Sequence, residues 1–332
     1  MSVIRTLISK LLVIIEKYRL FDSLLFPLQT NILHTVSFLS KIVCSFFRKL
    51  TQCFSEYLRI RFEIHIIEKR TSEKEAAPMS ICDNDIILFH QACREIINRE
   101  RASMGIGTLS EKTVHAVLKR FYEPDPEHQE IPVENFVADI LRDGEIIEIQ
   151  TRGFNKLRRK LDTFLKYYPV TIVYPIIHTK WLYWINEETG ELSPKRKSPK
   201  TGTFYDAVPE LYKIKMYLDN PNLHLCLVLI DADEYRLLNG WSRDRKKGSS
   251  RFDRIPVELV DELYIGGPAD YRLFVPEGLP ENYTSKDFAK ATHIPVGYAQ
   301  TLLGILYFLQ VVERTGKSGR SYTYRNTFKT PE

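Results

Sequence analysis

The sequence predicts an α/β fold in which helices flank a mixed sheet, followed by a smaller domain of two helices and a β-hairpin. Between residues 108 and 177 the predicted elements run helix, three strands, helix and strand. Two of these strands flank Asp143-Gly144, a dipeptide that favours a two-residue type I′ turn. Of the 332 residues, 44% are hydrophobic and 12% are aromatic, which suits a globular core.

The N-terminal part of the chain differs from the remainder in charge. Residues 1–70 contain 11 Lys/Arg and 5 Asp/Glu, whereas the remainder contains 36 Lys/Arg and 37 Asp/Glu. The excess positive charge of the chain, +5 in all, therefore lies in residues 1–70. The overall charge is therefore no argument for nucleic-acid binding. Pro27 and several polar residues interrupt the longest apolar run, which disfavours membrane contact by residues 1–65. We expect residues 1–78 to be a basic, apolar extension, helical or poorly ordered, with Met79 as an alternative natural start.

The five cysteines are scattered, without the spacing of a disulfide framework or of a structural zinc site. This usage indicates a reducing, cytoplasmic compartment. Neither a Walker A motif nor a G-x-G-x-x-G loop is present in the sequence, so there is no signature of a nucleotide-phosphate loop.

The main domain, expected over residues 79–275, begins with helices. A helical pattern runs from Asp83 to about Arg101, and Thr108-Leu-Ser-Glu111 is a capping box that opens a second helix ending near Tyr122. A short strand near Glu130–Val133 precedes the hairpin. An Arg/Lys-rich helix, Gly153 to about Tyr167, and an apolar strand, Val170–Ile177, follow it.

The predicted hairpin, residues 135–151, has the most informative pattern in the chain. With a type I′ turn, Arg142 pairs with Glu145, and the register then places Asp139 opposite Glu148. Opposed carboxylates repel each other, and a bound cation relieves that repulsion. Gln150 lies on the same face as Glu148, while the reverse face is apolar and has to be buried. The pattern indicates a metal site for phosphate chemistry; the alternative is an ordinary acidic surface hairpin.

The element order, the Asp on the middle strand and the E-x-Q on the next strand resemble the core of the PD-(D/E)XK nuclease-like superfamily. The resemblance covers about residues 108–177. It implies that Asp139 and Glu148 bind a divalent metal, Mg²⁺ or Mn²⁺. Gln150 stands where most members carry a Lys that orients or activates the attacking water, and Gln can neither act as a base nor supply charge.

Further residues are candidates for the same site. The resemblance implies a Glu on the first helix, and Glu111 matches it, although this is also where a capping-box Glu belongs. His115 lies one turn further on the same face. Lys156 or Lys160 is a candidate to replace the missing Lys, against the simpler interpretation that both belong to a solvated basic helix face.

Beyond this core the sequence predicts another hairpin around Lys180–Ile185, a helix over about Pro209–Leu218 and an apolar strand, Leu223–Ile230. The acids that follow the strand, Asp231 to Glu234, are interpreted either as a second metal cluster or as solvated caps. Residues 240–254 are basic with interleaved aromatics, which suits either phosphate and base contacts or a solvated loop.

The C-terminal domain, expected over residues 276–332, resembles a winged helix-turn-helix. Residues 284–291 form a short capped helix, 296–310 a longer helix, and two strands flank the turn 316–320. The resemblance implies that the second helix enters the major groove while the wing contacts phosphates. The residues expected to meet bases are Tyr298, Gln300 and Thr301, and those expected to meet phosphates are Lys317, Arg320 and Arg325. The alternative is a protein-docking or self-association module.

The leading hypothesis is a Mg²⁺- or Mn²⁺-dependent DNA endonuclease in which Asp139 and Glu148 hold the metal, Gln150 orients water or substrate, and Glu111 positions the water shell. Two alternatives stay open: a catalytically inactive DNA-binding regulator with the nuclease-like fold, and a protein-interaction scaffold that uses the winged helix. The arrangement from residue 108 onward also resembles a family of uncharacterised bacterial proteins, which implies no reaction.

Overall fold

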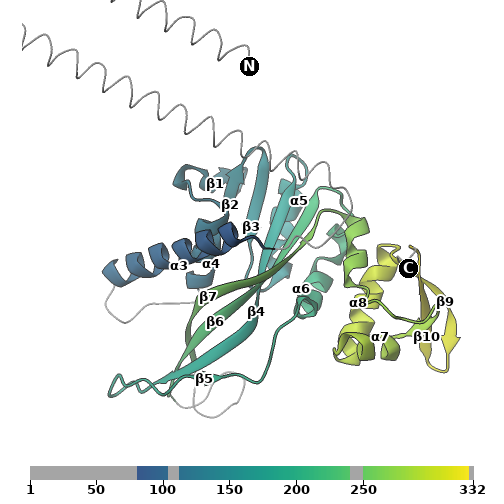
Figure 1. Cartoon of the computed structure of the whole chain (residues 1–332). Coiled ribbons are helices and arrows are strands. Elements are labelled where there is room, and N and C mark those ends of the chain that lie inside the picture. Colours follow the sequence, from purple (N-terminus) through teal and green to yellow (C-terminus); the bar gives the residue numbers. More distant parts are fainter. Residues whose placement is uncertain (1–80, 104–111, 240–249, 329–332) are drawn as a thin grey trace, which may run out of the picture. The chain divides into compact units, whose positions relative to one another are not determined.

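The computed structural model describes residues 81–103, 112–239 and 250–328, all of which belong to the compact unit Ala77–Glu332 (Figure 1). The predicted extension over residues 1–78 and the Thr108–Glu111 capping box lie outside the described residues. Within the described ranges, no helix combines the length and the apolar character needed to cross a membrane.

The protein is a mixed α/β structure built on a seven-stranded sheet with the order β1-β2-β3-β4-β6-β7, to which β5 adds by pairing with β4. Strands β3, β4 and β6 run parallel, and the other pairings are antiparallel, so the sheet is mixed as predicted. The strands are β1 (Gln129–Val133), β2 (Phe136–Arg142), β3 (Glu145–Ile149), β4 (Val170–Ile185), β5 (Arg196–Lys197), β6 (Leu223–Leu237) and β7 (Ser250–Ile265).

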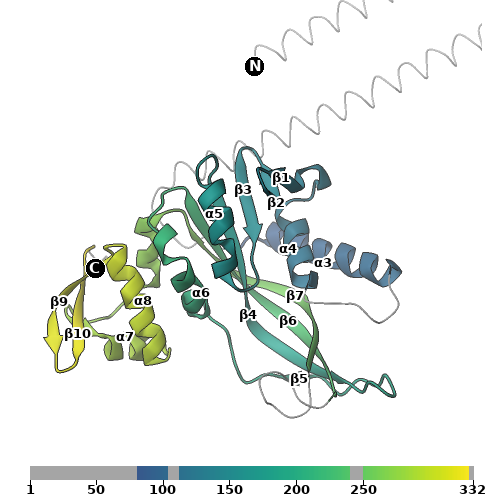
Figure 2. The ribbon, with the colours of Figure 1, turned by 180° about the vertical axis from the view of Figure 1, so that it is seen from behind.

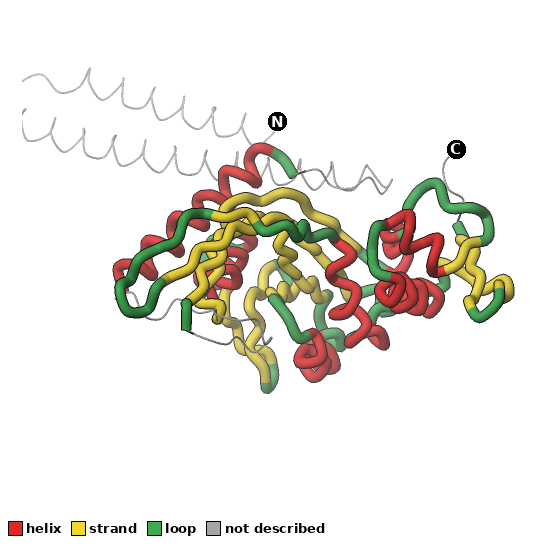
Figure 3. Tube along the Cα trace, turned by 90° about the horizontal axis from the view of Figure 1, so that it is seen from below, coloured by secondary structure: helices red, strands yellow, loops and turns green. Residues whose placement is uncertain are grey.

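Helices lie on both sides of this sheet (Figure 3). On one side α3 (Asp83–Ser103) and α4 (Lys112–Tyr122) bury a cluster that includes Phe89, Val117 and Leu118. On the other side α5 and α6 pack over a second cluster around Phe154 and Phe164. The helices on this side and the short 3₁₀ turns are η1 (Pro126–His128), η2 (Phe154–Leu157), α5 (Arg158–Phe164), η3 (Phe204–Ala207), α6 (Val208–Lys213), η4 (Lys215–Tyr217) and η5 (Pro268–Phe274).

Two strands are longer than the sequence predicts, and a third, β7, has no counterpart in the prediction. Residues 170–177 and 180–185 form one strand, β4, which is interrupted only by a bulge between Ile177 and Lys180. Strand β6 continues past Ile230, and β7 pairs along its whole length and includes part of the segment predicted as a basic loop. The distal parts of β4, β6 and β7, with β5, extend beyond the helices as an arm (Figures 1 and 2).

The C-terminal elements follow the predicted order of helix, helix and hairpin. Thr284 caps α7 in a capping box with Asp287, as the sequence indicates. The three-stranded sheet has the order β8-β10-β9. The buried cluster beneath α5 and α6 is continuous with the apolar face of α8. The elements are β8 (Tyr283–Thr284), α7 (Ser285–Thr292), α8 (Val296–Phe308), β9 (Val312–Ser318) and β10 (Ser321–Asn326).

Candidate functional site

The hairpin that carries the candidate site has the predicted turn and register. Asp143 and Gly144 have φ values of 51° and 78°, and two consecutive positive values are what a type I′ turn requires. Arg142 pairs with Glu145, and the ladder continues to Ile140 opposite Ile147. The four apolar residues predicted to form one buried face are all buried, but Ala138 belongs to the cluster beneath α5 and α6, whereas Ile140, Ile147 and Ile149 belong to the cluster beneath α3 and α4.

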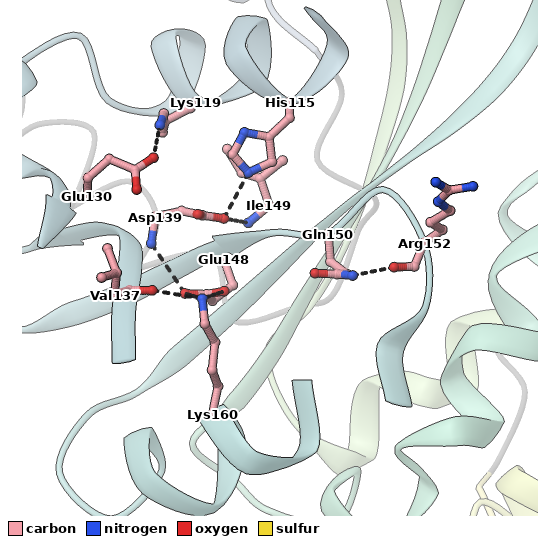
Figure 4. Close-up of polar contacts among 10 residues, drawn as sticks. All are labelled: His115, Lys119, Glu130, Val137, Asp139, Glu148, Ile149, Gln150, Arg152 and Lys160. Atoms are coloured by element: carbon pink, nitrogen blue, oxygen red, sulfur yellow. Dashed lines mark hydrogen bonds and ion pairs between the residues drawn. The ribbon is translucent and has the colours of Figure 1, made fainter. Parts of the chain in front are cut away.

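Past Ile140 the backbone ladder between β2 and β3 gives way to contacts made by two carboxylates. The backbone N–H of Asp139 donates to Glu148 Oε1 at 3.2 Å, and the backbone N–H of Ile149 donates to Asp139 Oδ2 at 2.8 Å. Each acid therefore satisfies a backbone group of the opposite strand. The two side chains meet where the strands separate (Figure 4).

His115 approaches Asp139 from α4. Its Nε2 lies 3.1 Å from Asp139 Oδ2, and this hydrogen bond links α4 to the carboxylate between the two strands (Figure 4). Burial raises the pKa of Asp139, but the hydrogen bond and charge of His115, with the Ile149 N–H, hold that pKa below its ordinary value. Asp139 therefore stays an anion in the folded protein over the neutral pH range.

Lys160 approaches Glu148 from α5, on the opposite side of the sheet. Its Nζ donates to Glu148 Oε2 at 2.7 Å, to Oε1 at 3.0 Å and to the carbonyl of Val137 at 2.8 Å. The Glu148 side chain is only 3% exposed. Burial and the nearby charge of Asp139 raise the pKa of Glu148 to about 7, although Lys160 opposes that rise. The interpretation of Lys160 as part of a solvated basic face is therefore wrong, whereas Lys156 is exposed as that interpretation expects.

The structure does not bring Gln150 into this group. Its side-chain amide donates to the carbonyl of Arg152, two residues on, and no contact joins it to either carboxylate (Figure 4). Glu111, the other candidate from the sequence, lies outside the described residues. The side chains that the fold assembles are thus Asp139, Glu148, His115 and Lys160.

The donor set fits a Mg²⁺-type ion only as a two-carboxylate site. Oδ1 of Asp139 accepts no hydrogen bond from the described residues, because both donors use Oδ2. Catalytic Mg²⁺ is commonly held by one or two carboxylates, with water and phosphate oxygens completing its shell. Among residues 81–103, 112–239 and 250–328, no group of three or more His, Cys, Asp and Glu side chains is arranged as a metal cage.

The C-terminal residues predicted to contact DNA have mixed surroundings. Gln300, Lys317 and Arg320 are exposed. Lys317 also lies 5.1 Å above the ring of Tyr322. Arg325 forms ion pairs with Glu313 at 2.7 Å and with Glu281 at 3.6 Å, so its guanidinium charge is already balanced by carboxylates.

Two further residues of the second helix were predicted to meet bases. Thr301 is partly buried, and its hydroxyl donates to the carbonyl of Gly297. Tyr298 is partly buried and lies near enough to Tyr174 of β4 to influence its pKa. The side chains of Tyr298 and Thr301 are therefore both less exposed than base contacts would require.

The acids after Ile230 do not act as predicted. They lie inside β6, not after its end, so neither a metal cluster nor a helix cap is formed by them. Asp231 accepts the N–H of Thr179 at the β4 bulge. Glu234 is fully buried beside Lys180, Arg236 and Arg254, and these cations overcome the effect of burial and lower its pKa to about 2. An acid directly opposite Arg254 on β7 and diagonal to Lys180 on β4 is the signal that sequence reasoning missed.

Comparison with known proteins finds a family model that covers the region of the site. Residues 112–266 match the family model described as Domain of unknown function (DUF8091). A protein of Treponema pallidum (strain Nichols) described as "Uncharacterized protein" is 30% identical over 233 residues, which are 67% of this chain and 88% of that protein. No solved structure matches the chain. The chain therefore belongs to the same family as this Treponema pallidum protein, and the matched DUF8091 region includes Asp139, Glu148, His115 and Lys160.

Proposed function

We propose that the protein is a Mg²⁺- or Mn²⁺-dependent DNA endonuclease with a PD-(D/E)XK-like core and a C-terminal winged helix-turn-helix. The observation that supports this best is the meeting of Asp139 and Glu148 where β2 and β3 separate, with an ammonium group on Glu148. The cytoplasmic location expected from the scattered cysteines agrees with an intracellular DNA substrate. Cys82, Cys93 and Cys226, the cysteines in the described residues, are free thiols.

The chain's own residues have separate roles in this proposal. Asp139 and Glu148 hold the metal, which when bound supplies an activated water and neutralises charge on the phosphate. His115 fixes the orientation of Asp139 through Oδ2 and leaves Oδ1 for the metal. Lys160 supplies the positive charge that Gln150 lacks, since its Nζ already lies against Glu148. Gln150 is then left to contact substrate.

A second function, a DNA-binding regulator without catalysis, is favoured by a different observation. Lys160 engages both oxygens of Glu148, and Gln150 is turned to the backbone of Arg152. A lysine that permanently neutralises Glu148 would take the place of the metal. The same carboxylates would then only hold the sheet together.

Cleavage of plasmid and single-stranded DNA in Mg²⁺ or Mn²⁺ tests the proposal. The full chain should cut, and Asp139→Asn and Glu148→Gln should lose at least about a hundredfold in rate, because each removes a charged metal ligand. Asp219→Asn, an exposed Asp on the loop before β6, is the matched control and should cut normally. Equal cutting by all four proteins would mean a contaminating nuclease, and the proposal would fail.

The winged-helix part of the proposal has its own test. Lys317→Gln and Arg320→Gln should weaken DNA binding and each reduce the slope of log affinity against log salt by about one. Lys286→Gln, an exposed residue of α7, is the control. Unchanged slopes in both variants would favour a module that docks a protein partner or a second copy of the chain.

A further inference from the structure

The arm, which consists of the distal parts of β4, β6 and β7 with β5, carries aromatic and basic side chains that the candidate nuclease site does not use. The arm extends beyond the helices that cover the remainder of the sheet (Figures 1 and 2). Three of its aromatic side chains, Trp181, Tyr183 and Tyr235, are only partly buried. Partly exposed rings on a sheet surface outside the helical layers indicate a surface that binds another molecule.

Trp181, Tyr183 and Tyr235 share one face of the arm, whereas Trp184, the next residue of β4, lies on the other face. Tyr183 on β4 stacks on Tyr235 of β6, with ring centroids 5.0 Å apart and planes inclined by 10°. Lys195 Nζ lies 4.7 Å from the centre of the Trp181 ring and 5.7 Å from that of Tyr183. Lys197 is directly opposite Trp181 in the register of β4 and β5, so its side chain emerges on the same face.

The edge of this face is positively charged. Four of the six residues from Lys195 to Lys200 are basic, all four are exposed, and the segment contains no acid. Lys195 is paired with Asp233, and Lys200 with Asp206. Among the residues that the structure describes, the side chains of Arg196 and Lys197 have no acidic partner. Lys197 is therefore an uncompensated cation beside the row of rings, whereas Arg196 pairs with Leu182 and emerges on the other face.

Rings beside exposed cations are how proteins bind single-stranded nucleic acids, because bases stack on the aromatic faces while phosphates meet the basic groups. A duplex cannot use such a surface, since its base faces are already stacked on one another. We propose that this aromatic–lysine face of the arm binds single-stranded DNA, with bases on Trp181 and Tyr183 and phosphate at Lys197. The choice of DNA rests on the proposed function; the binding surface itself does not.

Fluorescence anisotropy with the full chain and a labelled thymidine oligonucleotide of about 20 nucleotides tests this proposal. The titration is carried out in EDTA, so a failure of metal-dependent cleavage leaves the result unaffected. Trp181→Ala and Tyr183→Ala should each weaken binding about fivefold or more, and Trp181→Phe should retain most of it. Lys197→Gln should weaken binding and reduce the salt slope by about 0.7.

The matched controls are Tyr212→Ala and Lys166→Gln, which remove an exposed aromatic ring and an exposed lysine elsewhere on the protein. Both should bind like the unmodified chain. Lys197→Gln guards against misfolding, because this exposed side chain supports no packing. Unchanged affinity for the single-stranded oligonucleotide in all arm variants would overturn the proposal. Tighter binding of a uridine oligonucleotide would overturn the assignment to DNA.

Discussion

Asp139 and Glu148 join the two strands of the hairpin through their side chains at the point where the backbone ladder ends. The backbone N–H of Asp139 donates to the Glu148 carboxylate at 3.2 Å, and the backbone N–H of Ile149 donates to the Asp139 carboxylate at 2.8 Å. His115 holds one acid from α4 and Lys160 holds the other from α5. One polar network thus passes through the sheet, and its parts can be tested separately.

The first prediction concerns the titration of Glu148. Its pKa is raised from 4.5 to about 7, so between these pH values the folded chain binds a proton that the unfolded chain releases. The free energy of unfolding should therefore fall as pH rises through this window. Glu148→Gln cannot ionise, so its stability relative to the unmodified chain should improve by up to about 3 kcal/mol over the window. Urea unfolding in EDTA between pH 4.5 and 8 measures this, and a constant difference would contradict it.

The second prediction concerns the Lys160–Glu148 pair. Lys160→Met leaves a buried carboxylate without its cation, which should cost about 1–3 kcal/mol of unfolding free energy at pH 8. Lys156→Met, on the exposed side of the same segment, should change stability by less than about 0.5 kcal/mol. Adding Glu148→Gln to Lys160→Met should recover most of the loss. A double-mutant cycle with a coupling energy near zero would show that the pair is not formed.

The third prediction concerns the turn that sets the register. Gly144 has a φ of +78°, and an added Cβ would meet no atom within 4 Å, so only backbone strain acts there. Gly144→Ala should destabilise the protein by about 1–2 kcal/mol in urea unfolding. Gly267 is extended and equally uncrowded, so Gly267→Ala is the control and should be neutral or slightly stabilising. Equal effects of the two variants would argue against the type I′ turn.

The fourth prediction concerns the buried acid of the arm. Glu234→Gln leaves Lys180, Arg236 and Arg254 without their shared carboxylate, which should cost about 3–5 kcal/mol at pH 7. The pKa of Glu234 is lowered from 4.5 to about 2, so this stabilisation is complete above pH 4.5 and lost as pH falls toward 2. Unfolding at pH 7 and pH 3 should show the difference between the two proteins shrink. The exposed Glu187→Gln is the control, and a difference that is independent of pH would contradict the assignment.

Local signals in the sequence were sufficient for the hairpin and for the element order. The Asp143-Gly144 turn has few allowed geometries, so it determines the register as far as Ile140 and Ile147. The capping box at Thr284 likewise defines the start of α7. These predictions rest on interactions between residues close in the chain, which a single sequence displays.

Contacts between distant segments could not be predicted in this way. Whether Lys160 or Lys156 reaches Glu148 depends on how the 3₁₀ turn and α5 pack on the sheet, because residues four apart share one helical face and only their position along the helix separates them. The position of Glu234 depends on β6 extending past its predicted end and on β7, which was not predicted, and bulges hide both in the sequence pattern. Gln150 matched a family position by spacing alone, which does not determine its rotamer.

The central claim is that Asp139 and Glu148 form one divalent-metal site. Isothermal titration calorimetry of the full chain, stripped with EDTA and titrated with Mn²⁺, tests it most directly. The account predicts a binding event that Asp139→Asn and Glu148→Gln each weaken by at least about tenfold, since each removes one of the two carboxylate ligands found in the described part of the chain, while Asp219→Asn binds like the unmodified chain. Equal Mn²⁺ affinity in all four proteins, or no binding by any of them, would contradict it.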